Sequence, residues 1–109
     1  YIIISEILFN SQGSDEATQA ASFAYAYKLA ERNPHIKGFI VHRAVDDLYE
    51  KNSDKIACGI YNCDANGMIS TPKQMCEVFK YIDTPQSAAY TQFALPIIGA
   101  SSWAAVGCN

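Results

Sequence analysis

The sequence has no apolar run near the roughly 20 residues that a membrane-spanning helix needs, and its start has no basic region of the signal-peptide type. Its eight Lys and Arg residues are scattered, and the formal net charge is −3. Neither a membrane nor a nucleic acid is therefore an expected partner. The location of the protein stays open, and a secreted or periplasmic location is one that the sequence allows.

Standard metal-binding spacings are also absent. Cys58, Cys63 and Cys76 follow one another at spacings of 5 and 13 residues, which match no standard pair of zinc ligands. A stretch that begins at Asn62 resembles the start of a calcium loop, but its twelfth position is Lys73 in place of a bidentate Glu. We expect no metal ion and no cofactor.

The four cysteines, of which Cys108 is the last, permit two disulfides by three pairings. Cys58 and Cys63 are the favoured pair because only a short loop separates them. Buried free thiols are at least an equal prediction for these residues. Half of the residues are apolar, so a core can form without disulfides.

The first part of the chain predicts a strand, a helix and a second strand. Residues 1–5 are an apolar run rich in isoleucine, which suits a central strand of a parallel sheet. Residues 15–32 begin with two carboxylates and end before Asn33-Pro34, as a helix does. Residues 37–42 form the second strand. This order predicts a right-handed parallel unit.

An alanine-rich stripe on the predicted helix suits close packing on a sheet. Its members are Ala17, Ala20, Ala21, Ala24 and Tyr27, widened by Phe23, Ala26 and Ala30. Two parallel strands leave open edges, so the chain must gain neighbours. These are either the rest of a larger barrel or further copies of the chain.

A long polar loop, residues 43–71, follows the second strand. Connections in such units usually have about 2 to 6 residues, and much longer loops are typically functional. Within the loop, Asn66-Gly67 predicts the turn of a small hairpin.

The last third of the chain predicts short helices. Thr71 is the expected N-cap of the first, with Pro72 at its first position and Gln74 completing a capping box. Its inward face is expected to hold Met75, Val78, Phe79 and Ile82. Thr84-Pro85 begins another helix, which Pro96 interrupts.

Polar residues follow both strands at their C-terminal ends. Glu6 ends the first strand, and His42 and Arg43 end the second, with Asp46 one turn beyond. In parallel α/β folds this end of the sheet faces the active site. Arg43 can hold Glu6 ionised or bind sugar hydroxyls. A solvated Glu6, or a structural ion pair of Arg43 with Glu6 or an aspartate, is the alternative.

Several strings resemble the C-terminal part of the domain-of-unknown-function family numbered 5722. They include Ile4-Ser5-Glu6, Phe39-Ile40-Val41-His42-Arg43 with Asp46, the run from Val78 to Thr84, and Phe93 to Gly99. The family is similar to glycoside hydrolases with a (β/α)8 barrel and catalytic glutamates on strands four and seven. One departure is Ile7-Leu8, where the family pattern has Gln-Gly.

The resemblance implies an α/β chain that contains strands seven and eight of a TIM-type barrel, with residues 1–109 as one partial domain. Glu6 then occupies the nucleophile position of a retaining glycoside hydrolase. His42, Arg43 and Asp46 are expected to bind the carbohydrate substrate, and the acid/base glutamate on strand four lies outside this chain.

Two other functions stay open. One is a non-catalytic α/β module that serves assembly or binds carbohydrate. The other is a small α/β enzyme complete in itself, for which the sequence offers no convincing pair of nucleophile and base.

Overall fold

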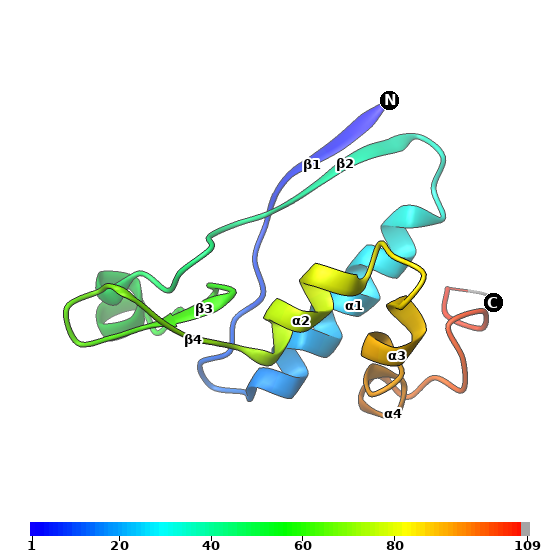
Figure 1. The fold of residues 1–109 in the computed structure, drawn as a ribbon. Helices are drawn as coiled ribbons and strands as arrows, with labels where there is room; N and C mark the ends of the chain where they lie inside the picture. The colour runs from blue at the N-terminus through cyan, green and yellow to red at the C-terminus, as the bar shows by residue number, and fades with distance from the viewer. Residues whose placement is uncertain (108–109) are drawn as a thin grey trace.

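The computed structural model describes residues 1–107, which form two two-stranded sheets and a layer of helices (Figure 1). Strands β1 (Ile2–Ile7) and β2 (Ile36–Val41) pair in parallel, and helix α1 (Glu16–Glu31) connects them. This confirms the predicted order of strand, helix and strand and the parallel pairing of the two strands. A Cβ atom at position 38 would lie 3.0 Å from Ile3 Cγ2, so glycine at this position lets the strands approach.

Helix α1 begins and ends as the sequence predicts. The carboxylate of Asp15 accepts a hydrogen bond of 2.6 Å from the Thr18 backbone N–H and so caps the helix. Arg32 is the C-cap, and its guanidinium donates to the carbonyl oxygens of Trp103 and Val106. The last described segment is thereby tied to the end of α1.

The core lies mainly between helices. The alanine stripe of α1 packs against α2 (Gln74–Tyr81) and α4 (Ala94–Ile98), with residues of β2 at its margin. The expectation that the stripe packs on a sheet is therefore only partly met, because a two-stranded sheet is too narrow to cover it. The core residues are Ala20, Ala21, Phe23, Ala24, Ile60, Met75, Val78, Ile82 and Ala94.

The long loop after β2 has structure of its own. It contains a π-helical turn (Glu50–Asp54) and a hairpin of β3 (Tyr61–Cys63) and β4 (Ile69–Pro72), which pair antiparallel. The predicted turn at Asn66-Gly67 is confirmed, and Gly67 has a φ of 79°, in the left-handed region that favours glycine.

The predicted start of α2 is wrong. Thr71 and Pro72 belong to β4, since pairing with β3 takes up their backbone, and Lys73 is an N-cap without a side-chain hydrogen bond. The Gln74 N–H instead donates to Glu16 of α1, at 3.1 Å. A tertiary contact thus replaces the predicted local cap.

Three other helical predictions need correction. Phe79 is 49% exposed, although Met75, Val78 and Ile82 are buried as predicted. The next helix, α3 (Ser87–Thr91), begins two residues after Pro85. Pro96 lies in the first turn of α4, where its missing N–H has no helical partner to lose.

The favoured disulfide is also absent. Cys58, Cys63 and Cys76 are free thiols, and the first two are buried, which agrees with the alternative prediction. Cys108 lies outside the described residues. No helix of the described part combines the length and the hydropathy that crossing a bilayer demands.

Candidate functional site

The C-terminal ends of β1 and β2 bring two of the predicted residues together. Ile7 pairs with Val41, and the His42 N–H donates to the Ile7 carbonyl at 2.7 Å. Glu6 Oε1 then lies 3.7 Å from His42 Nδ1, and its side chain is 68% exposed. A carboxylate and an imidazole from neighbouring strands therefore share one edge of the sheet.

The register of the two strands is irregular at this edge. Ile4 is opposite Phe39 and Ile7 is opposite Val41, so β1 advances three residues while β2 advances two. One extra residue is accommodated in the part of β1 that contains Ser5 and Glu6. Such bulges re-aim side chains and are frequent next to active sites.

Arg43 has a strained backbone and different partners from those expected. Its φ is 72°, in the left-handed region that non-glycine residues rarely adopt. Its guanidinium lies 2.8 Å from Glu50 Oε1 and 3.8 Å from Asp47 Oδ2. No ion pair joins Arg43 to Glu6 in residues 1–107; the predicted aspartate partner is present as Asp47, but the closer partner, Glu50, was not predicted.

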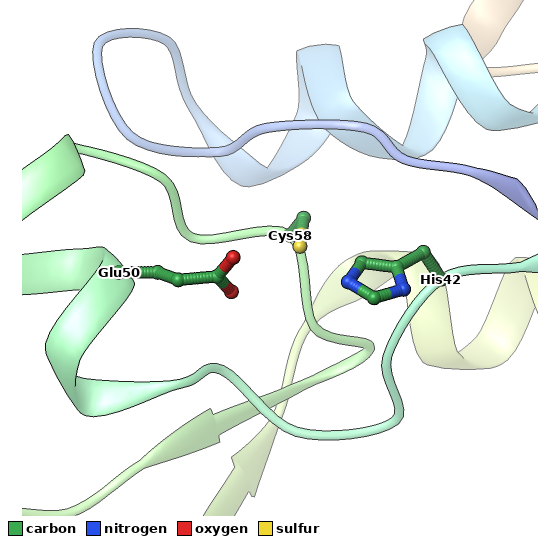
Figure 2. A group of neighbouring side chains, drawn as sticks. All are labelled: His42, Glu50 and Cys58. Atoms are coloured by element: carbon green, nitrogen blue, oxygen red, sulfur yellow. The ribbon is translucent and has the colours of Figure 1, made fainter.

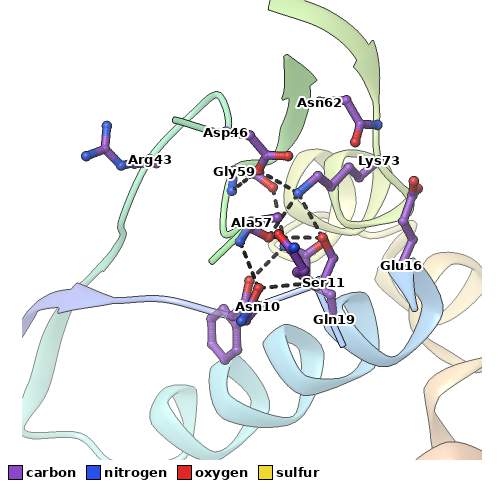
Figure 3. Close-up of polar contacts among 12 residues, drawn as sticks. Asn10, Ser11, Glu16, Gln19, Arg43, Asp46, Ala57, Gly59, Asn62 and Lys73 are labelled. Carbon is purple, nitrogen blue, oxygen red and sulfur yellow. Dashed lines mark hydrogen bonds and ion pairs between the residues drawn. The ribbon is translucent and has the colours of Figure 1, made fainter. Parts of the chain in front are cut away.

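Asp46 is buried, and its partner is Lys73. The two side chains are each 1% exposed, with Lys73 Nζ 2.7 Å from Asp46 Oδ1 (Figure 3). The Gly59 N–H donates to the same oxygen at 2.8 Å, and Lys73 also donates to Ser11 Oγ and the Ala57 carbonyl. Asp46 thus holds the loop together from inside, and direct contact with a sugar would require the loop to open.

The turn after β1 is fastened to the same loop. Asn10 Oδ1 accepts a hydrogen bond of 2.8 Å from the Ala57 N–H, and Asn10 Nδ2 donates to the Lys55 carbonyl. Gln19 of α1 donates to the carbonyls of Phe9 and Gly59. A Cβ at position 59 would lie 2.2 Å from the Asp46 backbone nitrogen, so only glycine fits there.

A mixed cluster of ligand-type side chains lies at this end of the molecule. His42, Glu50 and Cys58 each offer an atom within 4.8 Å of the other two, and Figure 2 shows the Cys58 sulfur between the carboxylate and the ring. Burial raises the pKa of the Cys58 thiol above its usual value, and the negative charge of Glu50 adds to this effect.

No sequence pattern points to several of these residues. Glu50 and Cys58 lie in a segment without periodicity, where spacing says nothing about proximity. For Lys73 the sequence predicts a place in the first turn of a helix and a mismatch to a calcium loop, and neither indicates an ion pair with Asp46. Lys73 lies between a strand and a helix with an apolar inward face. Its neighbours are therefore only a weak indication that the lysine side chain is buried.

One comparison with known proteins identifies the family. Residues 1–106 match the model of a family described as "Family of unknown function (DUF5722)". The chain belongs to this family, as its resemblance predicted. No curated protein and no solved structure matches the chain.

Proposed function

We propose that the chain carries the catalytic nucleophile of a retaining glycoside hydrolase. In this proposal β1 and β2 are strands seven and eight of a (β/α)8 barrel, and the chain forms the C-terminal part of that domain. The observation that carries the proposal is the position of Glu6. It lies near the C-terminal end of a parallel strand, in the bulged part of that strand. Its carboxylate lies next to His42, which follows the neighbouring strand.

The proposed chemistry follows from this position. The Glu6 carboxylate attacks the anomeric carbon and forms a glycosyl ester, while the bond to the leaving oxygen breaks. A second carboxyl group, about 5 to 5.5 Å away, donates its proton to that oxygen and later takes one from the water that hydrolyses the ester. Another strand of the barrel supplies that second group.

The other predicted residues take different roles. The half-buried imidazole of His42 is placed to hydrogen-bond Glu6 or a sugar hydroxyl. Arg43 keeps its guanidinium at the same edge, but its pairing with Glu50 leaves only its remaining donors for the substrate. Asp46 is a positioning residue, since Lys73 covers it.

The apolar surface of the small sheet supports the same arrangement. Ile2, Ile3 and Ile40 are each at least half exposed, and both outer edges of the β1–β2 pair are unpaired in the described chain. Further strands of a barrel would cover them. Self-association through the same edges is the second candidate, and it suits a non-catalytic module. Light scattering of the isolated chain distinguishes an oligomer from a monomer.

The test of the catalytic proposal is Glu6→Gln in the complete protein, assayed on a panel of aryl glycosides. We expect kcat to fall by about 10³-fold or more with little change in thermal stability, because the amide keeps the shape and cannot act as the nucleophile. Glu77→Gln, at an exposed position on α2, is the matched control and should keep full activity. Full activity in Glu6→Gln would remove Glu6 from the catalytic role.

A further inference from the structure

The cluster at the loop after β2 combines three kinds of metal ligand. His42 follows β2, Glu50 begins the π-helical turn, and Cys58 lies on the segment that leads back to β3. Three different parts of the chain thus meet in one place. An imidazole nitrogen, a thiol sulfur and a carboxylate oxygen are the three donor types that zinc accepts in proteins.

We propose that His42, Glu50 and Cys58 bind a divalent metal ion of the zinc type. This inference does not rest on the proposed hydrolase activity. Bonds of about 2.0 to 2.3 Å around a tetrahedral ion put neighbouring donor atoms roughly 3.5 Å apart. The three atoms already lie within 4.8 Å of one another, so small side-chain rotations bring them to an ion. Binding replaces the thiol proton, which passes to solvent.

Two of the three ligands already have partners of the kind that support metal ligands. Glu6 Oε1 lies 3.7 Å from His42 Nδ1, and a carboxylate beside the imidazole orients the ring. Arg43 Nε lies 2.8 Å from Glu50 Oε1, which leaves the second carboxylate oxygen for the ion. Arg43 is in this sense a positioning residue for Glu50.

Burial and coordination number indicate the kind of site. Cys58 is 1% exposed, while His42 and Glu50 retain 29% and 25% of their side-chain exposure. The Cys58 sulfur would therefore bind the ion from the interior of the protein. Solvent would reach the ion from the side of His42 and Glu50. Three protein ligands leave a fourth position for water or a substrate oxygen, as in catalytic zinc sites.

Of the three cysteines that the structure describes, only Cys58 belongs to the cluster. Cys63 and Cys76 are not in the cluster, although Cys63 is also buried. His42 and Cys58 are each eight residues from Glu50 in the sequence, a spacing that no sequence rule associates with zinc. The expectation of no metal site rests on spacing and on a local loop pattern, whereas the fold of the loop brings together residues that neither of these connects.

Cobalt(II) tests the proposal because its bond to a thiolate gives a charge-transfer band in the near ultraviolet. Titration of the reduced complete protein with Co²⁺ should give this band at one ion per chain, and Zn²⁺ should abolish it. Cys58→Ser should lose the band, and Cys76→Ser, the matched control, should keep it. Glu50→Gln should keep the band and weaken Co²⁺ binding about 10-fold or more.

Other outcomes would overturn the proposal. A wild-type protein without the band, or a Cys58→Ser variant that keeps it, excludes the site. If Cys58→Ser does not fold, His42→Gln decides, since its half-buried side chain can be exchanged more safely, and unchanged Co²⁺ affinity then contradicts the proposal. The readout is optical, so a protein that binds Co²⁺ and cleaves no glycoside keeps this inference and loses the hydrolase.

Discussion

The helical layer and the loop after β2 are held in place by different kinds of contact. In the helical layer, apolar side chains of α1, α2 and α4 meet at the regular spacing of helices. In the loop, single polar groups such as Asp46, Lys73 and Asn10 each fasten a particular backbone atom. Many similar apolar contacts therefore stabilise the helical layer, whereas the loop depends on a few polar contacts between particular groups.

The largest expected effect follows from the buried pair in the loop. Lys73→Met leaves the Asp46 carboxylate buried without a cation, and we expect the free energy of unfolding to fall by about 4 kcal/mol. Adding Asp46→Leu should restore part of the loss, because no charge is then left unpaired. Urea unfolding of the single and double variants measures both values. A double variant as unstable as the sum of its single variants would show that the pair is not coupled.

The helical layer should lose less from a single truncation. Met75 is fully buried, so Met75→Ala should cost about 3 kcal/mol through lost burial and the cavity it leaves. Met68 is 62% exposed in the hairpin, and Met68→Ala should change stability by less than about 0.5 kcal/mol. The same urea measurement compares the two. Equal losses would contradict the assignment of the core to the helices.

A smaller effect is expected at Arg43, where the loop begins. Both Arg43→Ala and Arg43→Gly remove the ion pairs with Glu50 and Asp47. Only glycine adopts a φ of 72° without strain, so the Gly variant should be more stable than the Ala variant by about 1 kcal/mol. An Ala variant that is as stable as the Gly variant would mean that the backbone relaxes.

The smallest effect concerns the cap of α1 and acid pH. The Thr18 backbone N–H lowers the pKa of Asp15 below its usual 3.8 in the folded protein. The ionised Asp15 cap therefore contributes to stability above pH 3.8, the pKa of an unfolded Asp. This contribution is lost as the pH falls through the lower pKa of Asp15 in the folded protein. Asp15→Asn keeps a capping oxygen, so stability should change little at pH 7 and should depend less on pH in the acid range. Urea midpoints between about pH 5 and pH 3 test this.

Elements that have a regular hydrophobic pattern or a typical turn sequence could be predicted from the sequence. The parallel unit of β1, α1 and β2 and the turn at Asn66-Gly67 follow from local patterns, and so does the burial of Met75 and Val78. The prediction failed at Thr71 and Pro72 because the local turn signal does not show how far the second strand of the hairpin extends, and Pro72 still pairs with Tyr61. Rules based on local sequence do not predict whether strand pairing or helix capping takes up these two residues.

The candidate site could be predicted only where strand ends define it. Glu6 and His42 meet because parallel strands place their C-terminal ends at one edge. Glu50 and Cys58 reach the same place through the path of a long loop, which Gly59 and the pair of Asp46 and Lys73 determine. The path of this loop depends on contacts between residues far apart in sequence, and neither composition nor residue spacing predicts it.

Covalent trapping tests the role of Glu6 most directly. Incubation of the complete protein with a panel of activated 2-deoxy-2-fluoroglycosides slows hydrolysis of the glycosyl ester, so the intermediate accumulates and can be located by peptide mass spectrometry. We predict one added sugar on the peptide that contains Glu6, and none in Glu6→Gln. A sugar attached to a different carboxylate would contradict the assignment of Glu6 as the nucleophile.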